Sequence, residues 1–330
     1  MKRFSVVSVF VIGVVLSAWT QAAWAEKVTL GMDWILSGRH GAWFAALDQG
    51  FFKAQGLDVK ITRGWGSSDG VKKLLARTYP VVFNDIGSMV KALGQGAPKM
   101  RALAVMYGSH PATFFSLKKQ NILKPKDLEG HTIADAVFST QLNLFPYFAK
   151  INGVNPCKVK WIKVQPKVKM SMLLAEKADV IGFYTMQIPL LEKMSAKLGG
   201  VNYMVWGEWG VKLLSNGILM REDTLKANPS FGRKVVHAAL KGYQFAIQNP
   251  QSTAKSVKKR FPLLDDEVTV KEVEIVSGTI QTPEAKQHGL GYILPDKAKT
   301  TVTELSKAYK LKAKVNPCDI YRNEFIETSY

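Results

Sequence analysis

The chain has 330 residues, 47% of them hydrophobic and 22% charged, which excludes collagen-like, mucin-like and disordered proteins. Its two cysteines are too few for a disulfide-dense scaffold, a self-contained iron–sulfur site or a four-thiolate zinc site. The net charge is +19, but the lysines are scattered and no nucleic-acid-binding motif is present, so we expect no nucleic-acid partner.

The first 25 residues have the pattern of a secretory signal peptide. Lys2 and Arg3 precede an apolar run over 5–18, and the small-x-small triplet 23–25 suits signal peptidase. The run is short for a membrane span, and no cysteine stands near the cleavage point to carry a lipid. We therefore predict a periplasmic protein, cleaved near Ala25/Glu26, whose net charge falls to +17.

The rest of the chain alternates strand and helix patterns. Short apolar or alternating segments predict strands at 28–32, 57–61, 81–83, 101–107, 113–117, 131–134, 159–164, 180–184, 203–206 and 217–220. Helices are predicted at 42–52, from about 71, after 85–88, at 140–150, 168–177, 185–197, 229–248, 252–260, 266–277 and 296–309, with a short helical turn at 124–130. This order predicts an α/β protein with helices on both faces of its sheets.

Ligands of such sheets bind beyond the carboxyl ends of the strands. The loops at these ends are 33–40, 65–69, 84–88, 138–141, 184–187 and 206–209. We therefore search these six loops for contact residues.

An ordered set of short motifs runs along the chain after residue 25. They are Asp33-Trp34, His40, Ala45-Ala46, Gly50-Phe51-Phe52, Gly56-Leu57-Asp58-Val59, the stretches 84–88 and 124–130, Asn228-Pro229 through Lys241-Gly242, and Asn249-Pro250. No single motif is specific. The set resembles the periplasmic solute-binding proteins of the thiamine-pyrimidine, sulfonate, taurine and nitrate type, which serve ABC importers.

The resemblance implies a two-lobed periplasmic binding protein fold of type II, in which each lobe is a mixed sheet with helices on both faces. Lobe I would comprise residues 26–116 and 218–330, and lobe II residues 117–217. The partners would be a small-molecule ligand and a membrane permease with its ATPase. We expect a monomer with no cofactor and no catalytic activity, which closes around its ligand by a hinge motion.

The ligand is expected to be a small aromatic or heteroaromatic polar solute of the pyrimidine kind. An anionic solute such as a sulfonate, nitrate or aromatic carboxylate is the alternative, because the chain is basic and the stretch 35–39 lacks the Pro-Asn of thiamine-precursor binders. An exported enzyme on the same fold is a further alternative. The chain lacks a nucleophile or metal motif and the cysteine-rich motif of the fungal pyrimidine synthases.

Nine residues in the strand-end loops are candidate ligand contacts. They are Trp34, His40, Trp65, Asp85, Ser88, Thr140, Tyr184, Glu208 and Trp209. The aromatic rings could stack on a planar solute, and Glu208 beside Trp209 suits a ring that carries N–H donors. Each also has a structural alternative: the tryptophans could pack at the lobe edge or hinge, the histidine could be structural, and Asp85 could only cap a helix.

The sequence also leaves open the roles of Arg39, of three serines and of the two cysteines. Arg39 could pair with an anionic ligand, but we expect a solvated loop arginine. Ser67, Ser68 and Ser139, like Thr140, stand at expected helix starts and are expected to act mainly as caps. Cys157 and Cys318 could form one disulfide in an oxidising compartment, which the sequence leaves open. The five histidines form no metal-binding pair.

Overall fold

The computed structural model describes residues 25–327, so the expected signal peptide lies outside the described residues except for Ala25. The strands are β1 (Glu26–Gly31), β2 (Leu57–Thr62), β3 (Val81–Asp85), β4 (Met100–Val105), β5 (Ala112–Leu117), β6 (Thr132–Asp135), β7 (Lys160–Lys163), β8 (Val180–Tyr184), β9 (Val201–Val205) and β10 (Asn216–Arg221). They form two separate sheets of five strands each, one in each lobe.

Both sheets are mixed. The first has the order β2-β1-β3-β10-β4, in which β10 runs antiparallel to both of its neighbours. The second has the order β7-β6-β8-β5-β9, in which β5 is the antiparallel strand. The chain thus crosses to the second lobe between β4 and β5 and returns between β9 and β10. The expected two-lobed α/β fold is confirmed, whereas the residue limits of the lobes stay a prediction.

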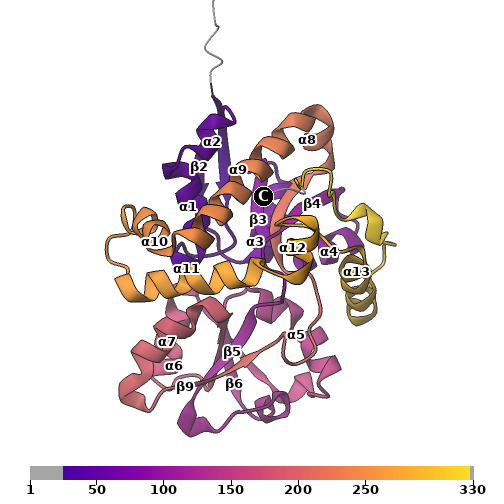
Figure 1. Cartoon of the computed structure of the whole chain (residues 1–330). Helices are drawn as coiled ribbons and strands as arrows, with labels where there is room; N and C mark the ends of the chain where they lie inside the picture. Colours follow the sequence, from indigo (N-terminus) through magenta and orange to yellow (C-terminus); the bar gives the residue numbers. More distant parts are fainter. Residues whose placement is uncertain (1–24, 328–330) are drawn as a thin grey trace, which may run out of the picture.

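The α-helices cover the sheets. They are α1 (Gly41–Asp48), α2 (Phe51–Ala54), α3 (Ser67–Leu75), α4 (Ile86–Gly94), α5 (Thr140–Ile151), α6 (Lys169–Leu174), α7 (Ile188–Ser195), α8 (Glu222–Ala227), α9 (Pro229–Gln248), α10 (Pro250–Lys258), α11 (Asp266–Ile280), α12 (Pro283–His288) and α13 (Pro295–Tyr309). In the first lobe α1, α9, α10 and α11 pack together, and α13 packs on α4 (Figure 1). Helix α11 runs along the boundary between the lobes and contacts α7 of the second lobe.

Three helix predictions differ from the structure. The helix expected over 42–52 is broken into α1 and α2, because Gly50 adopts a left-handed φ of 73° that ends the first helix. Helix α3 begins at Ser67 rather than near Val71, so Ser67 and Ser68 lie inside its first turn and Gly66 is the N-cap. Helices α8 and α12 were not expected, because each is only six residues long.

The core consists of large side chains between the sheets and their helices. Trp43 of α1 packs on Phe83 of β3 and on Tyr243 of α9, with ring centres 5.3 and 5.9 Å apart. In the second lobe Trp206 stacks on Phe148 of α5, with ring centres 4.5 Å apart. Burying each such ring stabilises the fold by about 2–3 kcal/mol. Within residues 25–327, no helix is both long and apolar enough to cross a membrane.

Candidate ligand-binding site

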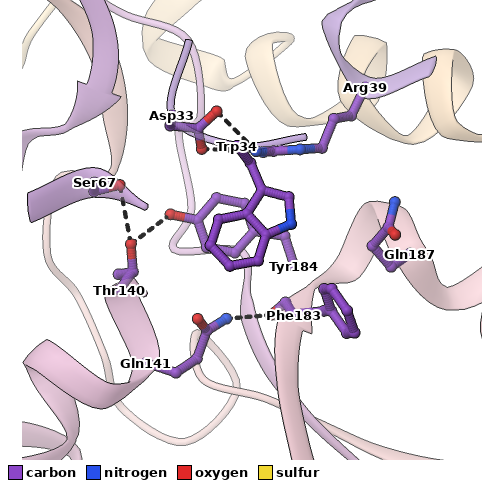
Figure 2. Close-up of a pocket in the computed structure, with 9 residues that line it drawn as sticks. All are labelled: Asp33, Trp34, Arg39, Ser67, Thr140, Gln141, Phe183, Tyr184 and Gln187. Carbon is purple, nitrogen blue, oxygen red and sulfur yellow. Dashed lines mark hydrogen bonds and ion pairs between the residues drawn. The ribbon is translucent and has the colours of Figure 1, made fainter. Parts of the chain in front are cut away.

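A small pocket lies where the two lobes meet (Figure 2). It spans about 330 Å³, part of it open to solvent. The first lobe contributes Asp33, Trp34, Arg39 and Ser67, and the second contributes Thr140, Gln141, Phe183, Tyr184 and Gln187. The pocket therefore has its full lining only when the lobes are together.

Strand ends and helix starts place these side chains. Asp33 and Trp34 follow β1, and Tyr184 is the last residue of β8. Thr140 opens α5, whose N-cap Ser139 accepts a hydrogen bond from the Leu142 N–H, as the sequence predicts. The carboxyl ends of the parallel strands thus meet at the boundary between the lobes.

A buried ion pair forms the base of the pocket in the first lobe. The Arg39 Nη2 atom lies 2.7 Å from both carboxylate oxygens of Asp33, and both side chains are 4% exposed. Burial alone would raise the pKa of Asp33, but the charge of Arg39 and the hydrogen bond from His40 hold that pKa well below its ordinary value. The expectation of a solvated Arg39 is therefore wrong, because a buried carboxylate six residues earlier is its partner.

His40 supports this pair from behind. The Ser37 N–H donates to His40 Nδ1 at 3.3 Å, which leaves Nε2–H to donate to Asp33 at 3.1 Å. Burial and the neighbouring Arg39 lower the pKa of His40 to about 4, so the imidazole is neutral at pH 7. The histidine orients the carboxylate and does not line the pocket.

A chain of hydrogen bonds connects the lobes around the pocket. The Asn216 side-chain amide at the start of β10 donates to Asp33 at 2.8 Å, and the Tyr184 hydroxyl donates to Asn216 Oδ1 at 2.9 Å. The Thr140 hydroxyl lies 2.9 Å from the Tyr184 hydroxyl and 3.2 Å from Ser67 Oγ. Four elements from both lobes are thus joined through one polar network.

Aromatic rings form the walls of the pocket. Trp34 meets Phe183 edge to face across the lobe boundary, with ring centres 6.4 Å apart. The Lys169 Nζ atom lies 4.8 Å from the Trp34 ring centre and 4.2 Å from that of Phe183. This ammonium is paired with Asp135 at 2.5 Å and is 1% exposed. Burial lowers the pKa of Lys169, and Asp135 opposes this effect.

Two glutamines bring amide groups to the pocket, and one N–H of each is already engaged. The Gln141 amide N–H donates to the Phe183 carbonyl, and the Gln187 amide N–H donates to Glu272 of α11 (Figure 2 shows the former). The carbonyl oxygen and the second N–H of each amide remain available to a solute. Burial raises the pKa of Glu272 to about 7.

Three of the nine expected contact residues line this pocket, namely Trp34, Thr140 and Tyr184. Trp65 is 42% exposed and lines a separate surface hollow with Phe138 and Pro166. Asp85 caps α4 by accepting from the Ser88 N–H at 2.6 Å and the Ser88 hydroxyl at 2.9 Å. Ser88 itself lines a neighbouring groove.

Glu208 and Trp209 lie away from the pocket lining. They follow β9, which stands at the edge of the second sheet, beyond β5 and two positions from β8. Glu208 is exposed, and Trp209 is half-buried against the core. The ligand role suggested for this aromatic and acidic group is therefore not supported by its position.

The pocket contains residues that sequence reasoning did not select. Gln141 and Gln187 fall within two of the strand-end loops, so their polar side chains were a usable signal. Phe183 gave no such signal, because it lies inside the hydrophobic strand β8. The sequence does not say which side chains of that strand face the pocket. Glu272 acts from α11, more than 200 residues after the first pocket residue.

Other expected features can be located too. Cys157 and Cys318 are exposed free thiols, so the disulfide that the sequence left open is not formed in the structure. Residues 25–327 contain no group of three or more His, Cys, Asp or Glu side chains that could hold a metal ion.

Comparisons with known proteins identify relatives over most of the chain. A family model described as "NMT1/THI5 like" matches residues 37–253. The chain is 22% identical to a formylaminopyrimidine-binding protein of Halalkalibacterium halodurans, over 78% of this chain and 79% of the relative. It is 23% identical to the riboflavin-binding protein RibY of Chloroflexus aurantiacus, over 91% of this chain and 86% of the relative.

A solved structure shares the fold. The alkanesulfonate-binding protein SsuA from Xanthomonas axonopodis pv. citri, bound to MOPS, superposes with a TM-score of 0.71 at 13% identity. The match covers 90% of this chain and 98% of that protein. At this identity the likeness concerns the architecture of the two lobes.

Proposed function

The chain belongs to the NMT1/THI5-like family, and on that premise we propose that it is the periplasmic substrate-binding component of an ABC importer. It captures a small, neutral, heteroaromatic solute between its lobes and delivers it to a membrane permease with its ATPase. It acts as a monomer, needs no cofactor and performs no chemistry. For the lobe limits, expected at 26–116 with 218–330 and at 117–217, we propose a shift of a few residues, so that all of β5 falls in the second lobe and all of β10 in the first.

The observation that carries this proposal is an aromatic pocket whose charges are already paired. Among the described residues that line the pocket, Arg39 is the only cation, and its guanidinium is engaged by Asp33. An anionic solute would have to compete with that buried carboxylate for Arg39 and would lie close to its negative charge. A neutral ring stacks on Trp34 without disturbing the pair.

The names of two relatives support a nitrogen heterocycle. They refer to a formylaminopyrimidine and to riboflavin. The closed pocket leaves only about 30 Å³ of free volume, so the lobes must separate to admit a solute. A pyrimidine has one ring and needs less separation of the lobes than a three-ring flavin.

The polar groups around the pocket suit such a ring. The free oxygens of the Gln141 and Gln187 amides can accept hydrogen bonds from ring N–H or amino groups. The Ser67 and Thr140 hydroxyls offer further partners across the pocket from Gln187 (Figure 2). A few polar groups on apolar walls fix the orientation of the solute and so give specificity.

Calorimetric titration of the mature protein tests the proposal. The probes are an aminopyrimidine, a formylaminopyrimidine, riboflavin, an aryl sulfonate and nitrate. We expect a pyrimidine to bind with 1:1 stoichiometry and neither the sulfonate nor nitrate to displace it. Displacement of the bound pyrimidine by either anion would contradict the proposal, as would turnover of the pyrimidine.

A further inference from the structure

A larger groove lies beside the pocket, on the same boundary between the lobes. It encloses about 1220 Å³, part of it open to solvent. Helices α3 and α4 form its first-lobe walls, and Phe138 and Asn143 of the second lobe complete it. Ser68, Phe138 and Asn143 line the groove but not the solute pocket, and the Ser68 hydroxyl hydrogen-bonds to both of the other two. The groove is therefore a separate space that also exists only when the lobes are together.

Two lysines without a carboxylate partner line this groove. Lys72 of α3 has its Nζ atom 4.7 Å from the ring centre of Phe138. Lys91 of α4 reaches across the boundary, with Nζ 3.4 Å from the Asn143 carbonyl oxygen and 4.3 Å from the Tyr309 ring centre. Neither lysine makes an ion pair within residues 25–327, whereas the adjacent Lys73 pairs with Asp69 at 2.8 Å.

The groove favours an anion by its composition. Its lining contains no acidic side chain, and its polar members are the two lysines with serine, glutamine and asparagine. Of the acids on these two helices, Asp69 of α3 is paired with Lys73, and Asp85 at the start of α4 accepts two hydrogen bonds from Ser88. Burial lowers the pKa of Lys91, since part of its ammonium hydration is lost and no carboxylate replaces it. An anion beside Lys91 would supply the missing counter-charge.

We propose that this groove is a second binding site, for a phosphate-type oxyanion held between Lys72 and Lys91. The oxyanion bridges α3 and α4 of one lobe and the Phe138–Asn143 segment of the other. It therefore stabilises the closed arrangement of the lobes. The same chemistry is supplied by free phosphate or by the phosphate group of a phosphorylated solute that extends out of the pocket.

Titration of the mature protein with inorganic phosphate at constant ionic strength tests this site without a heterocyclic solute. The variants are Lys72→Gln, Lys91→Gln and Lys91→Arg, with Lys73→Gln as the matched control on α3. We expect one phosphate per chain, with affinity about tenfold weaker in each of the first two variants. Lys91→Arg keeps the charge and should retain binding, and Lys73→Gln should bind like the unmodified protein.

Comparing an aminopyrimidine alcohol with its phosphate monoester distinguishes the two sources of the oxyanion. If the group belongs to the solute, the ester binds more tightly than the alcohol and Lys91→Gln abolishes the gain. If it is a free ion, added phosphate strengthens binding of the alcohol. Absence of phosphate binding would overturn the proposal. So would a loss of phosphate affinity in Lys73→Gln as large as the loss in Lys72→Gln or Lys91→Gln. Neither outcome depends on whether a pyrimidine binds.

Discussion

Arg39 and Asp33 place a full positive and a full negative charge beside a pocket without giving it a net charge. Removing one partner of a buried pair leaves the other without compensation, which typically costs about 3–5 kcal/mol. We expect Arg39→Met to lower the free energy of unfolding in urea by about this amount. Arg77→Met removes an exposed pair with Asp223 and should cost less than about 1 kcal/mol. Equal losses of unfolding free energy in Arg39→Met and Arg77→Met would contradict a stabilising role for the buried pair.

Trp34 is the aromatic wall that a planar solute can stack on. Its removal should weaken solute binding by about 10- to 100-fold, since stacking on one aromatic ring is worth about 1–3 kcal/mol. The thermal midpoint of Trp34→Ala should change little, because the ring is only half-buried in a loop. Trp65→Ala provides the control, because this exposed ring lines a different hollow. Unchanged affinity in Trp34→Ala would remove Trp34 from the site.

Glu272 makes stability depend on pH in a defined direction. Burial raises its pKa from the ordinary 4.5 to about 7 in the folded chain. Between these pH values the folded protein holds a proton that the unfolded chain has released, so this group lowers stability as the pH rises through the window. Relative to the unmodified protein, Glu272→Gln should gain about 3 kcal/mol of unfolding free energy between pH 4.5 and 7.

Urea unfolding across this pH range measures the difference. The exposed Glu267 on the same helix is paired with Lys271, which lowers its pKa. Glu267→Gln should therefore show only a small change of opposite sign. A constant difference between Glu272→Gln and the unmodified protein would show that Glu272 does not titrate in this window.

At the scale of single elements, the start of α3 controls how closely the lobes approach. A Cβ atom on Gly66 would lie 2.1 Å from the Phe138 carbonyl oxygen of the other lobe. Gly66→Ala should therefore oppose closure and weaken solute binding by tenfold or more, about 1.4 kcal/mol. Gly96→Ala introduces a similar strain at a φ of 89° but meets no neighbour, so it should reduce stability and leave affinity unchanged.

The position of a strand within its sheet explains which predicted site residues line the pocket and which do not. Tyr184 and Thr140 were found because they follow parallel strands at the centre of the second sheet, where ligands bind. Trp209 follows a similar strand end but at the sheet edge, and strand order is not visible in a single sequence. Arg39 was misjudged because its burial depends on tertiary contacts with Asp33 and Tyr107.

At the scale of the whole molecule, contacts on both sides of the pocket hold the lobes together. Lys193 of α7 pairs with Asp265 at 2.5 Å on one side, and the Tyr309 hydroxyl donates to the Asn143 carbonyl at 2.5 Å on the other. The Lys193–Asp265 pair is exposed and therefore contributes little to holding the lobes closed. We therefore expect the protein without solute to open.

Small-angle X-ray scattering measures this opening. The radius of gyration should fall when a pyrimidine is added, and it should fall less in Gly66→Ala. A radius that does not respond to a solute shown to bind by calorimetry would contradict closure. The two-lobed fold was expected from the family resemblance that the ordered motifs carry. The contacts that hold the closed form could not be predicted, because they join segments far apart in the chain.

The position of β10 has a consequence for how the chain acquires its structure. This strand lies between β3 and β4, although it is separated from β4 by the whole second lobe. All five strands of the second sheet are complete by Val205, whereas the first sheet still lacks an inner strand at that point. In a chain emerging from its N-terminus, the later lobe can therefore fold first, while the earlier one keeps two open strand edges. Such a nascent chain is a natural client for a chaperone that shields those edges until residues 216–221 arrive.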